Sequence, residues 1–474
     1  MYRLTTLSLV CRQWHELIVN TPMLWRCIDF SLKERAECML RRAKSAPITV
    51  KLTSNKRPPV PRDELDSALS VLKEVDIGMV QAMHLQGDGK TLDQASRLFK
   101  QGSAPLLESL RISRSRSDIY PYPFILGRDT FSSPMPSLRE LSIYRCGVVW
   151  SNLHPTAFSQ LEELNLEKLS ITAKTFQNLN NLRTLNITNV FLRDSLDSAS
   201  PPTAGVFLPR LEKFKLVSPF SQSVSIFDFV TFPCATQITV ESEYKLEHRD
   251  LMMTFLRRCG LRLDTKDTHR PSISTLAIEA WPRTSYEYTV VLTGWAHAGI
   301  DFTSTFQESS ISSKFTVSLT SATDDLPVLL DELADKIRLP DLRHLRVNDR
   351  GLLSRAHWTT MLAGLSSVDT LSVQAEDPLS FLSALSPNAG ETTSPSSSSE
   401  SLPEGGGLGD VLLPRLRTVA LSPLEDGAQS ATEALLALHG RILCNPFDVL
   451  KLQGHSACAE IARQMFGDLV RVES

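Results

Sequence analysis

Most of the chain repeats one short pattern of hydrophobic and polar positions, Leu-x-x-Leu-x followed by Leu, Ile or Val. Its last two apolar positions are two residues apart, so in a strand they share one face while polar side chains occupy the other. A strand of this kind is unstable alone and becomes stable by stacking on copies of itself. The clear copies begin at Leu107, Leu138, Leu161, Leu182, Leu211, Ile273, Leu342, Val368, Leu416 and Phe447.

Helices are predicted between these strands, because apolar residues there recur at three- and four-residue steps. The predicted helices cover residues 251–259, 324–337, 352–365, 432–443 and 457–469. Alternation of strands and helices predicts an α/β fold with a parallel sheet on the inner curve and helices and loops outside.

Two segments depart from the repeat. Residues 387–410 are rich in Ser, Pro and Gly, and this composition predicts a disordered insertion. Residues 281–312 lack the pattern, although a strand is expected from Tyr288 to Val291.

The first 30 residues do not repeat and have a helical pattern. Asn20 and Pro22 are expected to end the helix. The expected apolar stripe consists of Leu4, Leu7, Val10, Cys11, Trp14, Leu17 and Ile18. The pattern alone also fits a small helical cap on a larger domain.

The order Val10-Cys11-Arg12-x-Trp14 followed by Pro22-x-Leu24-Trp25 resembles the second half of an F-box. In particular, it is similar to the F-box proteins of mushroom-forming fungi, the agaricomycetes. An F-box normally begins with a Leu-Pro helix that supplies much of the docking surface. Here the sequence starts at Met1, directly with the later helix. We therefore expect a truncated F-box: either the sequence is cut short, or the protein lacks half of its docking module.

The repeats resemble a degenerate leucine-rich-repeat solenoid. F-box proteins with such a solenoid dock on a Skp-type linker subunit of a cullin ubiquitin ligase and hold a target protein on the solenoid. The resemblance implies a partial F-box at 1–30, a linking helix at 31–46 and a solenoid at 47–474. It assigns the linker side to Leu7, Val10, Cys11, Trp14, Leu24 and Trp25. Of these, Trp14 and Trp25 are expected mainly to pack inside the module.

Target binding is expected on the concave face of the sheet, where the side chains opposite the buried row point. These candidates mix both charges with hydroxyl groups, which suits a protein partner better than a phosphate backbone. They are Glu140, Ser142, Tyr144, Glu163, Asn165, Glu167, Thr184, Asn186, Thr188, His344 and Arg346. They can equally be solvated strand residues, and a free-standing interaction scaffold without a ubiquitin-ligase role stays open.

Charge is distributed unevenly along a chain whose net charge is −3. In residues 1–60, Lys and Arg outnumber Glu16, Asp29, Glu34 and Glu37 more than twofold. This suits an acidic protein partner or a solvated helix face; aromatic residues do not interleave with the basic ones, so nucleic acid is not expected. The sequence has no apolar run of membrane-spanning length and no signal peptide, so we expect no membrane partner and a cytoplasmic or nuclear location.

Motifs for catalysis are incomplete. Gly87-Asp88-Gly89-Lys90-Thr91 lacks the first glycine of a phosphate loop, since His84 occupies that position. Gly454-His455-Ser456-Ala457-Cys458 imitates a nucleophile elbow, but Cys458 replaces its last glycine and no histidine follows. Histidines lack zinc spacing, and the eight cysteines are expected to be small buried residues in a reducing compartment. We therefore expect no enzyme, metal or cofactor.

Overall fold

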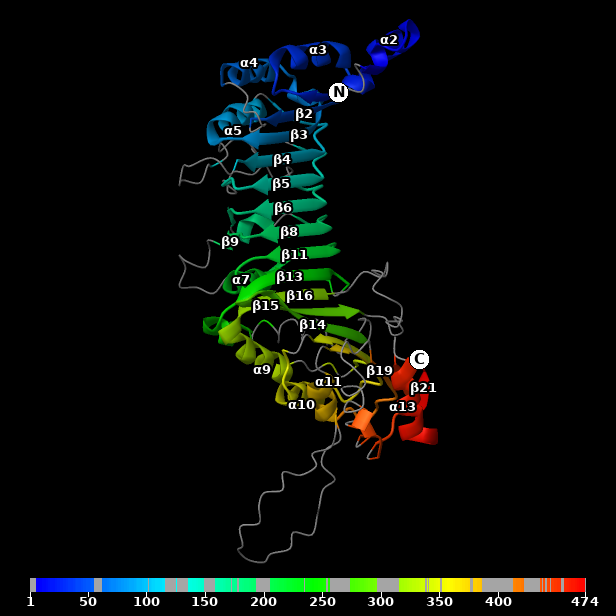
Figure 1. The fold of residues 1–474 in the computed structure, drawn as a ribbon. Helices are drawn as coiled ribbons and strands as arrows, with labels where there is room; N and C mark the ends of the chain where they lie inside the picture. Colours follow the sequence, from blue (N-terminus) through cyan, green and yellow to red (C-terminus); the bar gives the residue numbers. More distant parts are fainter. Residues whose placement is uncertain are drawn as a thin grey trace, which may run out of the picture. The chain divides into compact units, whose positions relative to one another are not determined.

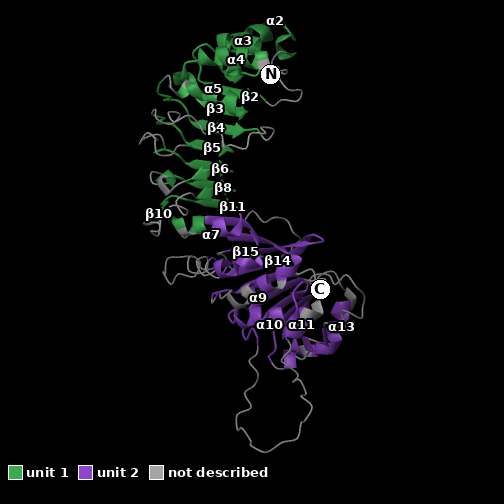
Figure 2. Ribbon diagram, turned by 90° about the vertical axis from the view of Figure 1, so that its left-hand side faces the viewer, with its two compact units in different colours: residues 1–218, 225–233 green, residues 219–224, 234–474 purple. Residues whose placement is uncertain are grey.

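The protein has a mixed α/β fold that divides into two compact units (Figures 1 and 2). The first unit contains residues 1–218 and 225–233, and the second contains residues 219–224 and 234–474. A computed structural model describes residues 6–54, 62–100, 102–115, 125, 135–148, 158–171, 173–176, 179–192, 205–233, 235–252, 255, 273–295, 315–336, 339, 341–349, 352–375, 378–385, 412–421, 435–436, 438–439, 441–443, 445–452 and 456–473. The expected insertion at 387–410 lies outside these residues.

The first unit begins with a helical head and continues as a row of parallel strands (Figure 1). The elements up to β3 are α2 (Arg12–Val19), η1 (Pro22–Trp25), β1 (Cys27–Asp29), α3 (Lys33–Ala43), β2 (Ile48–Thr53), α4 (Arg62–Lys73), η2 (Ile77–Met79) and β3 (Val80–Gly87). They are followed by α5 (Gly89–Ser96), η3 (Arg97–Lys100), β4 (Ser109–Arg114), β5 (Glu140–Tyr144), β6 (Glu163–Glu167), β8 (Thr184–Thr188) and β11 (Lys213–Val217). Short β7 (Ser170–Ile171) pairs with β9 (Phe191–Leu192), β10 (Val206–Phe207) pairs with β12 (Val230–Thr231), and η5 spans Ala173–Phe176.

Strand order in the first unit is β1–β2–β3–β4–β5–β6–β8–β11, and every pairing is parallel. Repeated motifs lie beside one another in the same register: Leu110, Leu141 and Leu164 occupy neighbouring positions on adjacent strands. These leucines are at most 1 % exposed. The expected parallel sheet is therefore confirmed here, because the apolar row of each strand is buried against equivalent rows on its neighbours.

The second unit has a mixed sheet with helices in the connections. Its first elements are β13 (Gln237–Tyr244), η6 (Leu246–His248), β14 (Thr275–Thr284), β15 (Glu287–Trp295), β16 (Phe315–Ala322), η7 (Thr323–Asp325), α9 (Leu326–Lys336), β17 (His344–Asp349) and α10 (Arg355–Ala363). The later elements are β18 (Thr370–Ala375), α11 (Pro378–Leu385), β19 (Thr418–Leu421), β20 (Val449–Leu452), α13 (Ser456–Phe466), η8 (Gly467–Leu469) and β21 (Arg471–Glu473). Helix α7 (Phe220–Phe229) has its first residues in this unit and its last residues in the other.

A hairpin interrupts the repeat in the second unit. Strand order is β13–β16–β15–β14–β17–β18–β19–β20–β21, and β15 is antiparallel to both of its neighbours. The expected strand at Tyr288–Val291 is confirmed within β15, but a wholly parallel sheet is wrong at this place. Thr284 pairs with Glu287 across a two-residue turn that reverses the chain.

Helices α9 and α10 lie within segments where the apolar spacing predicts helices, and α13 begins one residue before its predicted segment and ends inside it. In the described part of the chain, no helix combines the length and the apolar character needed to span a bilayer.

Candidate functional site

The N-terminal head has a break in its expected helix. Residues 6–8 form one helical turn, and α2 begins only at Arg12. Cys11 precedes α2 with an extended backbone, at φ −159° and ψ 166°, so the apolar stripe cannot be one continuous helix. Asn20 ends α2 as expected, and its N–H donates to the carbonyl oxygen of Glu16. Leu4 lies outside the described residues.

Trp25 holds the head together. Its side chain is 2 % exposed, and its indole N–H donates a 2.7 Å hydrogen bond to the carbonyl oxygen of Ile18. The guanidinium carbon of Arg42, on α3, lies 4.3 Å from the centre of the indole ring. Trp25 thus connects the end of α2 and η1 to α3, and its expected internal packing is confirmed.

Most other apolar residues of the head are exposed. Trp14 is 46 % exposed, so its expected internal packing is wrong; within α2 the only buried residue is Ile18. Trp14 and Leu17 are three positions apart and therefore share a face of α2. The exposed residues, which we call the N-terminal apolar patch, are Leu7, Leu9, Val10, Trp14, Leu17, Met23 and Leu24. Exposure of so many large apolar side chains within one short segment is typical of a protein-binding site.

One linker-side candidate, Trp25, differs from the rest in exposure. Cys11 is exposed like the patch residues, whereas Trp25 is buried within the head. A partner that covers the patch therefore reaches Leu7, Val10, Cys11, Trp14 and Leu24 directly. Leu9, Leu17 and Met23 are also exposed and complete the patch. The sequence signal for Leu17 is its three-residue spacing from Trp14 on α2, whereas Leu9 and Met23 lie outside α2 and have no such signal.

Polar side chains form columns on one face of the first unit's sheet. In β5, β6 and β8 the exposed or half-buried positions alternate with buried ones. The parallel register brings the expected residues together as Glu140, Glu163 and Thr184; Ser142, Asn165 and Asn186; and Tyr144, Glu167 and Thr188. We call this surface the polar face.

Asn165 connects three strands of the polar face. Its side-chain amide donates to Ser142 Oγ at 3.0 Å and to Glu163 Oε1 at 2.8 Å. The amide of Asn186 in turn donates to Asn165 Oδ1 at 2.5 Å. This ladder fixes side chains that would otherwise be mobile, and so gives the face a defined shape before any partner binds.

Basic residues precede the acidic ones on the polar face. Lys51, His84 and Arg111 occupy matching positions on β2, β3 and β4, and we call them the basic column. Burial lowers the pKa of His84, with further lowering by Lys51 and Arg111, while Glu140 acts in the opposite direction. Lys51 and His84 are absent from the expected target-binding residues because β2 and β3 precede the first clear motif copy. The signal for Lys51 was the alternation of Ile48, Val50 and Leu52, and the signal for His84 was its place between apolar Met83 and Leu85.

His344 and Arg346 belong to β17 in the second unit, where they alternate with buried Leu345 and Val347. Burial lowers the pKa of Arg346, and the nearby carboxylate of Glu279 opposes this effect.

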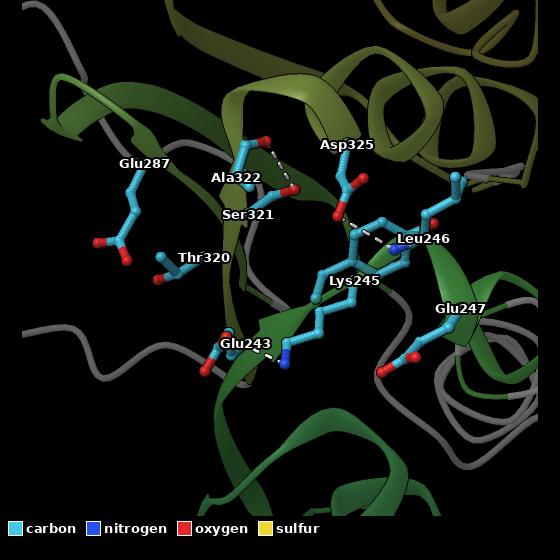
Figure 3. Close-up of a pocket in the computed structure, with 10 residues that line it drawn as sticks. Glu243, Lys245, Leu246, Glu247, Glu287, Thr320, Ser321, Ala322 and Asp325 are labelled. Atoms are coloured by element: carbon cyan, nitrogen blue, oxygen red, sulfur yellow. Dashed lines mark hydrogen bonds and ion pairs between the residues drawn. The ribbon is translucent and has the colours of Figure 1, made fainter.

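The second unit also contains a pocket of about 410 Å³ at the ends of β13 and β16 (Figure 3). The peptide N–H of Leu246 donates to Asp325 Oδ2 at 3.2 Å, and Lys245 Nζ lies 3.8 Å from Glu243 Oε1. The lining residues are Glu243, Tyr244, Lys245, Leu246, Glu247, Glu287, Thr320, Ser321, Ala322 and Asp325. Carboxylates outnumber the single ammonium group, so the pocket is negatively charged. No sequence motif indicated it.

The described residues contain no group of three or more His, Cys, Asp or Glu side chains placed to hold a metal ion. In the glycine-containing segment after β3, Asp88 Oδ1 accepts from the N–H of Thr91 at 2.8 Å and so caps α5.

The structure is that of a mixed α/β protein whose N-terminal head exposes a set of large apolar side chains. Residues 1–31 match the F-box-like family model, and this match supports an F-box protein. F-box domains generally bind Skp-type subunits. A comparison with curated proteins finds no match.

Proposed function

We propose that this protein is a substrate-recognition adaptor of a Skp/cullin/F-box ubiquitin ligase, of the type found in agaricomycete fungi. The observation that carries the proposal is the N-terminal apolar patch, which lies inside the segment that matches an F-box-like domain. Burial of a large apolar side chain such as Trp14 by a partner contributes favourably to the free energy of binding. A large exposed aromatic residue is the usual anchor of such contacts.

The remainder of the chain is proposed to be an irregular leucine-rich-repeat solenoid that holds the target protein. In this proposal the F-box-like segment covers residues 1–30, a linking helix covers 31–46 and the solenoid covers 47–474. Support comes from the parallel strands of the first unit, which share one register and one alternation of buried and polar positions. The target protein would bind on the polar face, and the adaptor itself would need no catalytic residue, metal or cofactor. It would act in the cytoplasm or nucleus.

Calorimetric titration of the full chain with a Skp-type linker subunit tests the adaptor role. We expect a one-to-one complex, with affinity that falls when Trp14 and Leu17 are replaced. Absence of binding by the unchanged chain overturns the adaptor proposal and favours a free-standing interaction scaffold. A control titration with a His15→Ala variant changes an exposed residue of the same helix that lies outside the patch.

A further inference from the structure

The basic column has a property that distinguishes it from the other charged rows of the first unit. Lys51 and Arg111 are exposed, and neither forms an ion pair with a carboxylate of the described residues. By contrast, two cations that directly precede strands form exposed ion pairs with carboxylates that precede the neighbouring strands. Arg139 lies 3.0 Å from Glu162, and Arg183 lies 3.3 Å from Glu212. Positive charge is therefore left available on the polar face itself.

Geometry makes the column small and well ordered. Its residues stand on three adjacent parallel strands, so about 10 Å separates the first from the last. The Arg111 guanidinium carbon lies 4.9 Å from the ring centre of Tyr144, which holds this cation against the sheet. A footprint of this size fits one or two anionic groups and not a long polyanion.

We propose that Lys51, His84 and Arg111 bind an anionic side chain of the target protein. This assignment rests on the proposed function, because it names what the target must present to the polar face. The next strands in order carry Glu140 and Glu163, whose charge opposes a continuous phosphate backbone. A protein segment can place an acidic group over the column and a neutral or basic group over these carboxylates.

His84 makes this binding sensitive to pH. The groups that face it are Lys51 on β2, Arg111 on β4 and Glu140 on β5, and together with burial they keep its pKa below the ordinary value. A bound anion favours the charged imidazolium, so binding must raise the pKa of His84. By linkage, affinity for the anion must increase as the pH falls toward that pKa.

The test uses the full chain with ¹³C-labelled histidine, and follows the His84 ring signal by NMR, assigned with His84→Gln. The probes are a fluorescein-labelled hexaglutamate peptide, inorganic phosphate and a short duplex DNA. We expect hexaglutamate or phosphate to raise the pKa of His84; the more effective probe tells whether the target presents a carboxylate or a phosphorylated side chain.

Two double variants with equal charge change decide whether the column is the site. Lys51→Ala with Arg111→Ala is expected to weaken hexaglutamate binding about fivefold to tenfold, and Arg139→Ala with Arg183→Ala less than about twofold. Equal losses in both doubles, an unchanged His84 pKa with both anions, or tighter binding of DNA than of hexaglutamate overturns the proposal. None of these probes involves the linker subunit, so failure of the adaptor role leaves this result interpretable.

Discussion

The indole N–H of Trp25 donates a 2.7 Å hydrogen bond to the carbonyl oxygen of Ile18. This bond connects η1 to the end of α2, and both side chains are nearly fully buried. Trp14, in the same short head, is 46 % exposed, so much of its side chain contacts solvent and not the protein interior. The two tryptophans therefore have separate roles, and substitution at each should give a different result.

Replacement of Trp25 should destabilise the head. Trp25→Ala is expected to cost about 3–5 kcal/mol in local stability, because it leaves a cavity and removes the bond to Ile18. Trp25→Phe keeps most of the ring and should cost less, about 1–2 kcal/mol, through the lost hydrogen bond and lost contact. Hydrogen exchange of the α2 amides measures this local effect. If α2 exchanges as slowly in Trp25→Ala as in the unchanged chain, the structural role of Trp25 is wrong.

Replacement of Trp14 should weaken linker binding and leave stability unchanged. Loss of a central aromatic anchor is expected to lower affinity about 30-fold, the effect of roughly 2 kcal/mol. Trp14→Ala should change the urea midpoint little, since exposed positions usually alter stability by less than about 0.5 kcal/mol. Calorimetry with the linker subunit gives the affinity, and His15→Ala is the matched control. Equal affinities for Trp14→Ala and His15→Ala would show that docking does not use this face.

The regular part of the sheet could be predicted from the sequence, because each motif carries its own register. Leu141 and Ile143 are two residues apart, so burial of one requires burial of the other and turns Ser142 outward. The same rule placed Asn165 and Asn186 on the polar face. The hydrogen bond between these two side chains depends on the pairing of β6 with β8, which the pattern within one strand does not indicate.

Other features depend on information that local patterns lack. Leu276 and Ile278 in β14 have the spacing of a parallel repeat, yet β14 pairs with antiparallel β15 through a turn of Ser285 and Tyr286. That turn has no Asn-Gly or Gly signal. Periodicity also shows which residues of α2 share a face, but not whether the same chain or a partner covers that face. For this reason the exposure of Trp14 was not foreseen.

Gly294 should tolerate no side chain. It pairs with Phe315 across β15 and β16, and a Cβ at this position would overlap the Phe315 ring. Gly294→Ala is expected to destabilise the second unit by about 1–3 kcal/mol through overpacking. Adding Phe315→Leu should recover part of this loss, because it removes the obstructing ring. Thermal unfolding of both variants provides the measurement, and no recovery in the double variant would contradict the stated cause.

Asn165 should stabilise the polar face both as a hydrogen-bond donor and as a hydrogen-bond acceptor. Asn165→Asp replaces the donating amide with an oxygen, so the bond to Glu163 is lost and two carboxylates face each other, while the Ser142 hydroxyl can reverse its role and donate to the new oxygen. The expected cost is about 1–2 kcal/mol at neutral pH. It should diminish as the pH falls below about 4, where carboxylates become protonated. Asn165→Ala is the control without new charge; if its loss shows the same pH dependence as Asn165→Asp, charge repulsion is not the reason.

The cysteines should divide into reactive and protected thiols. Burial raises the pKa of Cys146 to about 12, and its thiol donates to the carbonyl oxygen of Tyr144 at 3.3 Å, whereas Cys11 and Cys27 are exposed. The thiolate is the reactive form, so iodoacetamide at pH 8 should label Cys11 and Cys27 in the native protein and Cys146 only after denaturation. The unfolded Cys146 thiol ionises near its ordinary pKa of 9.0 while the folded thiol stays protonated. Stability must therefore fall as the pH rises above about 9, and Cys146→Ala should remove this part of the pH dependence. Peptide mapping by mass spectrometry gives the labelling, and rapid labelling of native Cys146 would show that its site opens to solvent.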